Sequence, residues 1–254
     1  MSQPVGDGPA AARTGLRRQP RQEPAAGSTR PSRSLLREVA GILVIAIVVS
    51  LLVKTVLVQA FFVQSASMEP TLHGCPGCVG DRVLVNKLTT HTAGVHRGDI
   101  VVFHDSAGWL PHVSSTPGLQ SRLHDALAFI GLAPATGESD LVKRVIGVGG
   151  DTVEGRGGKV YVNGAQLREP YVFPGNTATE VNFRVTVPLG KLWVMGDHRS
   201  ESADSRFHQR EPGKGSVPVS DVVGRAFVVI WPLDRVGSLD RPATFDQSPL
   251  HAKG

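Results

Sequence analysis

The longest apolar run of the chain lies near its N-terminus. The stretch VAGILVIAIVVSLLV, residues 39–53, has no charged side chain, and Lys54 and the apolar TVLVQAFFV follow it. A helix over 21 such residues would be about 31 Å long, close to the hydrocarbon thickness of a bilayer. The pattern therefore predicts a transmembrane helix over residues 38–60, in which the stem of Lys54 reaches towards the interface.

A cleaved secretory signal is the alternative interpretation of this run. Val58-Gln59-Ala60 would then be the small-residue cleavage site. The long polar leader and the length of the apolar run favour an uncleaved anchor. In both interpretations the rest of the chain is exported.

Beyond residue 79 short apolar runs alternate with turn residues. Runs of this length that are rich in Val, Ile and Phe are typical of β-strands. Seven of them occupy residues 81–88, 99–105, 140–148, 158–167, 181–188, 191–197 and 222–231. Asn163-Gly164 inside the fourth run predicts a hairpin with a type I′ turn. We therefore expect a mainly β, antiparallel-rich domain over residues 61–233.

Two segments do not follow the strand pattern. LQSRLHDALAFIGL, residues 119–132, has apolar residues at helical spacing and lies inside a long connection between predicted strands. We expect this connection, residues 104–140, to be a surface insertion on the β domain. Residues 234–254 are expected to form a C-terminal tail.

The positive charge of the chain is concentrated in front of the apolar run. The net charge is +5, and residues 1–38 hold seven arginines against three acidic residues, which leaves about +1 for the remainder. A nucleic-acid-binding protein needs a basic face on the fold itself, so no nucleic-acid partner is expected. Residues 1–37 have few large apolar side chains and are expected to be a disordered tail. The positive-inside rule places this tail in the cytoplasm and the β domain outside.

The two cysteines of the chain, Cys75 and Cys78, form one C-x-x-C in HGCPGCVG. A second C-x-x-C and a histidine at zinc-finger spacing are both missing, so the sequence predicts no zinc site. A thioredoxin-like redox site would need a βαβ context. We prefer a small structural disulfide that pins a loop; two free thiols, and redox control of a neighbouring site, are the alternatives.

Three polar segments in apolar surroundings are candidates for chemistry. In SASMEPTL, residues 65–72, small residues and a proline indicate either a linker between a membrane anchor and a folded domain or a nucleophilic serine held close to a membrane surface. In DLVKRVIGVGGD, Lys143 lies in an apolar strand, where burial would lower its pKa and make a neutral amine available as a base. Arg144 cannot serve, because its guanidinium does not deprotonate. The alternative for Lys143 is an exposed strand edge.

The third segment, MGDHRSESADSRFH at residues 195–208, is dense in Asp, Ser and Arg. These residue types form ion pairs that fix a loop, and a plain polar turn is the alternative. The nine histidines of the chain show no metal-ligand spacing, and the patterns G-x-S-x-G, S-x-x-K and K-T-G are absent from the sequence. We therefore expect no metal and no cofactor.

The motifs SASMEPTL, GDRVLVNKL, DLVKRVIGVGGDTV and MGDHRSESADSR occur in this order behind the apolar run. Together they resemble the bacterial type I signal peptidase (leader peptidase) family over about residues 60–231. The family often has Gly where Ala66 stands, and Asn where His198 and Glu201 stand. None of these departures removes a group that carries chemistry.

The resemblance implies a serine peptidase with a Ser/Lys dyad, anchored in the bacterial cell membrane, and a β domain of the signal peptidase I type. Pro70 and the small residues around Ser67 would then form a sharp, exposed turn that leaves the nucleophile open to an extended peptide. Ser67 would be the nucleophile, and Lys143 the general base that also activates the water for deacylation. The Ser67 backbone N–H and the Ser65 hydroxyl would hold the oxyanion, and Ser202 would hold the Lys143 amine. Four residues of the last motif would support the site: Asp197, Arg199, Asp204 and Arg206.

The implied substrates are the signal peptides of exported preproteins, with small residues at the first and third positions before the cut. An extended peptide pairs with a strand edge while alternate side chains enter pockets. The expected pocket walls are Val63, Met68, Leu141 and Val142. Phe61 and Phe62 are expected to press the domain against the lipid bilayer.

Two other classes of function compete with this interpretation. A membrane-tethered β domain that only binds would not need the intact Ser67 and Lys143. A self-cleaving repressor-type protease shares the Ser/Lys dyad, but that class carries a DNA-binding domain in place of an anchor. The N-terminal apolar run and the near-neutral β domain disfavour the repressor-type protease.

Overall fold

The computed structural model describes residues 33–75, 77–88, 94–110, 140–247 and 250. The chain divides into one unit that ends at Val44 and a second unit that begins at Ile45. The predicted helix over residues 119–132, most of the predicted insertion and most of the predicted N-terminal tail lie outside the described residues.

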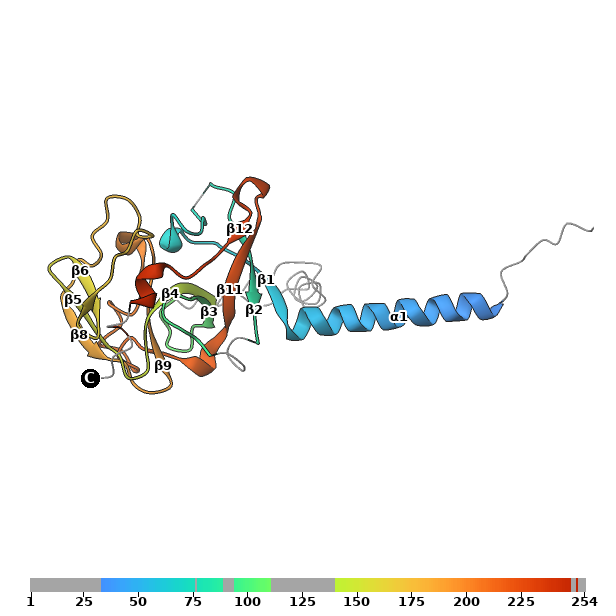
Figure 1. Cartoon of the computed structure of the whole chain (residues 1–254), viewed down its shortest axis with the longest axis horizontal. Helices are drawn as coiled ribbons and strands as arrows, with labels where there is room; N and C mark the ends of the chain where they lie inside the picture. Colours follow the sequence, from blue (N-terminus) through green and yellow to red (C-terminus); the bar gives the residue numbers. More distant parts are fainter. Residues whose placement is uncertain (1–32, 76, 89–93, 111–139, 248–249, 251–254) are drawn as a thin grey trace, which may run out of the picture. The chain divides into compact units, whose positions relative to one another are not determined.

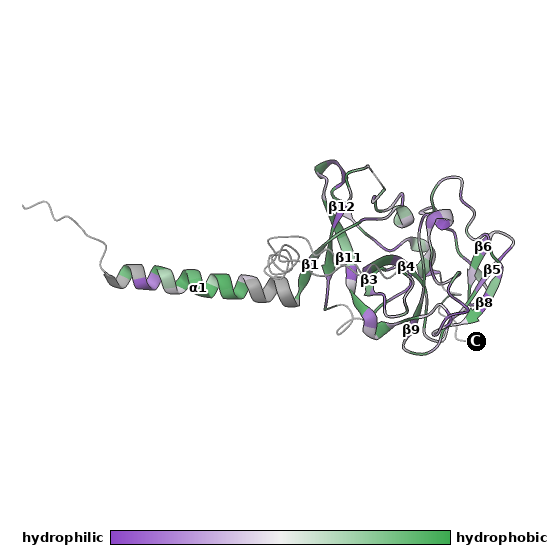
Figure 2. Ribbon diagram, turned by 180° about the vertical axis from the view of Figure 1, so that it is seen from behind, coloured by the Kyte–Doolittle hydropathy of each residue, from purple (hydrophilic) through white to green (hydrophobic). Residues whose placement is uncertain are grey.

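The N-terminal apolar run forms helix α1 (Arg33–Val56), whose apolar residues are green in Figure 2. The helix begins before the predicted residue 38 and ends before residue 60, because Val58–Phe62 enter a strand. Its exposed large apolar side chains are Leu35, Val39, Ile42, Leu43, Val44, Ile45, Ile47, Val48 and Val49. Within the described ranges, none of the helices has the combined length and apolar character needed to span a bilayer.

The larger of the two sheets in the described residues contains the strands that lie in or beside the four sequence motifs. Neighbouring strands are antiparallel throughout this sheet. Its order is β1 (Val58–Phe62), β2 (Arg82–Asn86), β11 (Val222–Trp231), β3 (Ile100–His104), β4 (Asp140–Val148), β9 (Lys191–Met195) and β10 (Val217–Pro218), with β12 (Gly237–Ser238) paired to β11.

The smaller sheet is also antiparallel and follows the order β7 (Ala165–Gln166), β6 (Lys159–Val162), β5 (Thr152–Arg156) and β8 (Phe183–Thr186). Figure 1 shows β5, β6 and β8 side by side at one end of the β region. The backbone φ angles of Asn163 and Gly164 are 50° and 82°, as the two central residues of a type I′ turn require. The predicted hairpin is therefore confirmed.

Among the described residues, five short 3-10 helices lie between or after these strands. They are η1 (Ala66–Met68), η2 (Arg199–Glu201), η3 (Val219–Asp221), η4 (Leu233–Arg235) and η5 (Ala243–Asp246). Two of them, η1 and η2, lie in the first and last of the sequence motifs. The expectation of a mainly β, antiparallel-rich domain is confirmed by the two sheets.

Strand β4 is the element that most directly positions the candidate site. It lies in the interior of the larger sheet between β3 and β9, with Lys143 opposite Val101 and Arg144 opposite Met195. Lys143 and Arg144 on this strand are both 2% exposed, so their charged groups need partners inside the domain.

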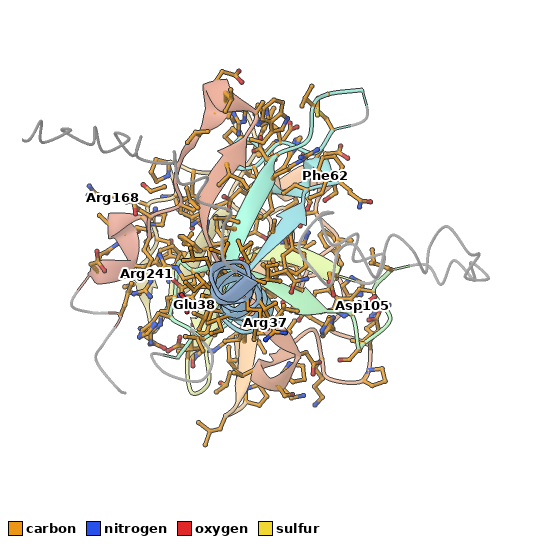
Figure 3. All side chains as sticks on the ribbon, turned by 90° about the vertical axis from the view of Figure 1, so that its right-hand side faces the viewer. Arg37, Glu38, Phe62, Asp105, Arg168 and Arg241 are labelled. Carbon is orange, nitrogen blue, oxygen red and sulfur yellow. A yellow bond between two sulfur atoms is a disulfide. The ribbon has the colours of Figure 1, made fainter. Side chains whose placement is uncertain are left out.

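The C-terminal segment is part of the folded domain, in contrast to the expected tail. Phe245 is 3% exposed and Leu250 is fully buried in an apolar cluster to which both sheets contribute. The Phe245 ring packs against Tyr171, and a Cβ on Gly98 would clash with it. Arg241, labelled in Figure 3, forms an ion pair with Asp99 at 2.5 Å.

Candidate active site

Ser67 lies in η1, where the chain turns after β1. Its carbonyl oxygen accepts a hydrogen bond of 3.1 Å from the His198 backbone N–H, which ties η1 to the loop after β9. The serine is only 4% exposed, whereas Ser65 is exposed. We expected a sharp, exposed turn that leaves this serine open to an extended peptide. The turn is present, but Ser67, its middle residue, is buried and in contact with Lys143.

Lys143 and Ser67 meet although 76 residues separate them in the chain. The Lys143 Nζ donates a hydrogen bond of 2.6 Å to the Ser67 Oγ. Lys143 is 2% exposed, so the interior position on β4 replaces the exposed strand edge of the alternative interpretation. The two groups thus form a buried amine–hydroxyl pair.

Burial lowers the pKa of Lys143 from 10.5 to about 8, against the carboxylates of Asp204 and Asp197, which raise it. Removing an ammonium ion from water is unfavourable, so burial stabilises the neutral amine relative to the charged form. At mildly alkaline pH a large fraction of this amine is neutral. A neutral amine at hydrogen-bond distance from a hydroxyl can accept its proton.

Ser65 is the second hydroxyl at this site. Its Oγ lies 3.0 Å from the Ser67 Oγ, and either hydroxyl can be the donor. Because Ser65 is exposed and Ser67 is buried, the Ser65 hydroxyl lies on the solvent side of the amine–hydroxyl pair. The oxyanion role expected for this hydroxyl stays a prediction.

The last motif packs directly against η1 through a glycine. A Cβ on Gly196 would clash with the Ser67 carbonyl oxygen and with the Ser202 Oγ. The Gly196 backbone N–H donates to Asp204 Oδ2 at 3.0 Å. Glycine is needed here because any side chain would separate the two motifs.

Ser202 lies beside the pair, but its hydrogen bond differs from the expected one. Its hydroxyl donates to Asp204 Oδ2 at 2.8 Å, in place of a contact with the Lys143 amine. Asp204 in turn accepts bonds of 2.8 and 2.9 Å from the Arg206 guanidinium. The carboxylate of Asp204 is therefore the centre of this loop, and Ser202 is one of its donors.

Asp197 connects three segments of the site. It accepts hydrogen bonds of 2.8 and 2.6 Å from the Arg144 Nε and Nη2, and one of 2.5 Å from the Thr71 hydroxyl. Arg144 is next to Lys143 on β4, and Thr71 is four residues after Ser67. This fully buried ion pair thus fixes the strand of the amine relative to the turn of the hydroxyl.

Arg199 extends the network to the segment between β7 and β8. Its guanidinium forms an ion pair of 2.5 Å with Glu169, and its Nε donates to the Gly196 carbonyl at 3.0 Å. The Tyr171 hydroxyl donates to Glu169 at 2.9 Å, and the Tyr171 ring lies 4.3 Å from the Arg144 guanidinium carbon.

The sequence analysis missed four residues of this network: Thr71, Glu169, Tyr171 and Gly196. Thr71 and Gly196 lie inside recognised motifs, so the motifs themselves were the available signal. Glu169 and Tyr171 lie in an irregular segment without a pattern, and the fold is what brings them to Arg199 and Arg144.

The expected pocket walls divide between two apolar clusters. Val63 and Met68 are 3% and 1% exposed, and Val142 packs against the same cluster. Leu141 packs instead against the cluster of Val101 and Phe103. Successive residues of a strand point to opposite faces, so Leu141 and Val142 do not share a wall.

The C-x-x-C segment follows η1 in the chain. Cys75 and Cys78 form a disulfide, and their Cα atoms are 5.4 Å apart. A Cβ on Gly74 would clash with the Ser65 backbone, so the loop packs against the start of the turn.

Comparison with known proteins assigns the chain to a family. Residues 36–231 match the family model described as "Signal peptidase, peptidase S26". The "Probable signal peptidase I" of Mycobacterium leprae (strain TN) is 41% identical over 243 residues, which covers 85% of this chain and 84% of the relative. The "Signal peptidase I" of Leptolyngbya laminosa is 32% identical over 227 residues, covering 89% and 94% of the two chains.

A solved structure, that of a signal peptidase I from Enterococcus faecalis V583, is 26% identical, with a TM-score of 0.32. The match covers 52% of this chain and 95% of that chain.

The sequence matches make the protein a serine peptidase. More particularly, the chain belongs to the signal peptidase family, peptidase S26.

Proposed function

We propose that the protein removes signal peptides from exported preproteins with Ser67 as the nucleophile and Lys143 as the general base. The observation that carries this proposal is the 2.6 Å hydrogen bond between the buried Lys143 Nζ and the Ser67 Oγ. Because both groups are present and in contact, they favour a catalytic function over that of a β domain that only binds.

In the proposed reaction the neutral Lys143 amine takes the Ser67 proton as the Oγ attacks the scissile carbonyl carbon. The Ser67 backbone N–H and the Ser65 hydroxyl hold the resulting oxyanion. The Lys143 ammonium then protonates the leaving amine, and the carbon–nitrogen bond breaks to leave an acyl-enzyme. A water molecule that gives its proton to the same amine hydrolyses the ester and restores Ser67.

The loop around Asp204 and the Asp197–Arg144 ion pair position these groups. Asp204 fixes Gly196 and Ser202 against η1, and Asp197 joins Arg144 to Thr71. Both carboxylates also favour the ammonium form of Lys143, which stabilises the cation formed in the first step. The strands and loops therefore supply the orientation that an amine base needs.

We further propose cleavage after small-x-small sites such as Ala-x-Ala. The residues beside Ser67 that were expected to form pockets, Val63 and Met68, are packed into the core together with Val142. Well-packed apolar walls leave little space for a large substrate side chain, so a small residue before the cleaved bond fits best.

Three substitutions test the dyad with a preprotein that has an Ala-x-Ala site. Ser67→Ala and Lys143→Ala should each lower kcat/KM by at least about a thousandfold while the domain remains folded, because nucleophile and base act as a unit. Lys143→Arg should be equally inactive, since guanidinium does not accept a proton. Lys159→Ala and Ser220→Ala, at exposed positions, are the matched controls. Cleavage that persists in Ser67→Ala or Lys143→Arg would sink the proposal.

We also propose that α1 anchors the protein in the bacterial membrane, with the N-terminus in the cytoplasm and the β domain outside. The uncharged run of residues 39–53 and the exposed apolar side chains of α1 support this. In fractionated cells the full-length protein should remain with the membranes after alkaline extraction. Replacement of Ile42, Ile45 and Val49 by Asp should release it, and retention of that variant would argue against the anchor.

A second lipid contact is proposed on the β domain. Phe62 and Trp231, both paired with Arg82 in the sheet, are 37% and 42% exposed, and Leu233 is 73% exposed. Phe62 lies at the surface in Figure 3, whereas Phe61, which was also expected to face lipid, is 4% exposed in the core. Successive side chains of a strand point to opposite faces, so only Phe62 of the two phenylalanines is exposed for lipid contact.

The double variant Phe62→Ser/Trp231→Ser tests this surface. It should cleave preproteins embedded in vesicles several-fold more slowly and a short soluble peptide at the normal rate. Leu189→Ser, at a residue that is 85% exposed, is the control. Equal loss on both substrates would count against lipid contact.

A further inference from the structure

The carboxylate of Glu69 lies beside Cys75 and Cys78, a neighbour that the C-x-x-C motif does not indicate. We propose that reduction of the Cys75–Cys78 disulfide creates a binding site for a thiophilic divalent cation, Zn²⁺, with Glu69 as the third protein ligand. This inference goes beyond the proposed peptidase function and does not rest on it.

The geometry brings three donors together. A carboxylate oxygen of Glu69 and the sulfur atoms of Cys75 and Cys78 all lie within 4.8 Å of one another, and all three residues are half-buried. Two ligands of a tetrahedral Zn²⁺ with bonds of about 2.3 Å are roughly 3.8 Å apart. The donors therefore need only small shifts to bind one ion, once the sulfur–sulfur bond is broken.

The turn between the cysteines directs both side chains to the same region. The Cys78 backbone N–H donates to the Cys75 carbonyl at 3.2 Å, and Gly77 has a φ of 82°, which glycine adopts without strain. Such a turn keeps its shape through backbone hydrogen bonding, which reduction of the sulfurs leaves untouched.

The base of the loop is fixed by contacts that do not involve sulfur. The His73 backbone N–H donates to Asp81 Oδ2, and the Asp81 N–H donates to the His73 carbonyl, both at 2.8 Å. Arg235 binds the Asp81 carboxylate at 2.9 and 3.0 Å, and Gly74 packs against the Ser65 backbone. The ligands are thus held close together in the reduced protein, which lowers the entropy lost on metal binding.

The chemistry of the site requires two successive steps. A dithiol reductant gives two electrons and two protons to the Cys75–Cys78 bond, which yields two thiols and an oxidised disulfide of the reductant. Zn²⁺ then replaces the two thiol protons and binds two thiolates and the Glu69 carboxylate. A water molecule completes a four-coordinate ion. In the oxidised protein the sulfurs have no thiolate to offer.

Glu69 gives this site a direct connection to the candidate active site. It follows Met68 directly and its backbone N–H donates to the Ala66 carbonyl at 3.0 Å, closing the turn that contains Ser67. The sequence analysis excluded zinc because a second cysteine pair is missing. The fold supplies a carboxylate in place of that pair.

Co²⁺ is the probe that tests the proposal, because thiolate ligands give it an intense charge-transfer band. The full-length protein in detergent is titrated with Co²⁺ in its oxidised form and after reduction and removal of the reductant without air. We expect the reduced protein to bind one equivalent with the thiolate band, and equimolar Zn²⁺ to displace it. The oxidised protein differs from the reduced protein only in the bond between the two sulfur atoms, and it should show no such band.

Two variants assign the ligands. Cys75→Ser should reduce the band of the reduced protein by about half, and Glu69→Gln should weaken Co²⁺ binding at least about tenfold, while Glu180→Gln at an exposed site should change nothing. A reduced wild-type protein without the thiolate band would overturn the proposal. If Glu69→Gln bound Co²⁺ as tightly as the wild type, Glu69 would not be a ligand, and the proposed three-ligand site would be wrong.

Discussion

Lys143 combines a cationic side chain with nearly complete burial. Its Nζ contacts the Ser67 hydroxyl, and its pKa is lowered to about 8 because the domain removes water from the amine. The same desolvation that makes the amine a usable base at moderate pH opposes folding whenever the amine is protonated. The proposed catalytic role therefore reduces the stability of the domain.

Replacement of Lys143 by Met should stabilise the protein. The folded pKa of about 8 lies below the unfolded value of 10.5, so below about pH 8 both states bind the proton and the full penalty is present. The shift corresponds to about 3 kcal/mol at most. The stability of the wild type should rise relative to Lys143→Met between pH 8 and 10.5.

Denaturant unfolding of both proteins across this pH range measures the difference. Lys143→Met should be more stable at about pH 7, and its advantage over the wild type should fade as the pH rises from about 8 to 10.5. A variant that is less stable at every pH would contradict the burial penalty.

At the residue scale, the chemical groups of the site are easier to predict than their surroundings. Ser67 and Lys143 were predicted because they lie in motifs whose residue types suit the chemistry. The burial of Ser67 was not predictable, because Lys143 and His198, which bind its side chain and its backbone, come from distant segments. The partner of Ser202 differs for the same reason, since Asp204 takes its hydrogen bond.

At the scale of elements, the site depends on how closely η1 and the loop after β9 approach. Gly196 has the Ser67 carbonyl on one side and Ser202 on the other, with no room for a Cβ. The backbone hydrogen bond from His198 to Ser67 holds the same contact. A small increase in this separation changes the distance between the Ser67 hydroxyl and its base.

Gly196→Ala should therefore impair catalysis strongly. We expect kcat to fall by at least about a hundredfold, since misplacement of a reacting group by about 1 Å has that effect. Gly237→Ala is the control, because the nearest atom to its added Cβ would be 3.9 Å away. Normal kcat in folded Gly196→Ala would show that the close contact is unnecessary.

A strand is predictable when its own residues determine where it begins and ends. It is not predictable when pairing or packing with a remote segment determines them. Strand β4 has the predicted bounds, because its apolar run ends at Gly149-Gly150. Strand β1 continues the apolar run of α1, and only its pairing with β2 marks where helix gives way to strand. Strand β5 was missed because TVEGR is largely polar, and Gly155 is there to admit the Phe183 ring.

At the scale of the whole molecule, the C-terminal segment joins the two sheets of the β domain. Arg241 binds Asp99, which precedes β3 of the larger sheet. Phe245 and Leu250 enter the apolar cluster to which both sheets contribute, and the Leu250 carbonyl accepts a bond of 3.1 Å from Asn163. The prolines and polar residues around Phe245 hide this role in the sequence, because its partners Gly98 and Tyr171 are remote in the chain.

Phe245→Ala should destabilise the domain by about 3–5 kcal/mol, since it removes a buried ring and leaves a cavity. Phe207→Ala, at a residue that is 51% exposed, should have less than about a quarter of that effect. Denaturant midpoints of the two variants give the comparison. Equal, small losses would mean that the C-terminal segment does not hold the sheets together.

The most direct test of the Ser67–Lys143 pair is the pH dependence of kcat/KM for the wild-type protein. A neutral amine base with a pKa of about 8 predicts a rate that falls roughly tenfold per pH unit below that value and levels off above it. A rate that stays constant between about pH 6 and pH 9, or that falls as the amine becomes neutral, would contradict a lysine base.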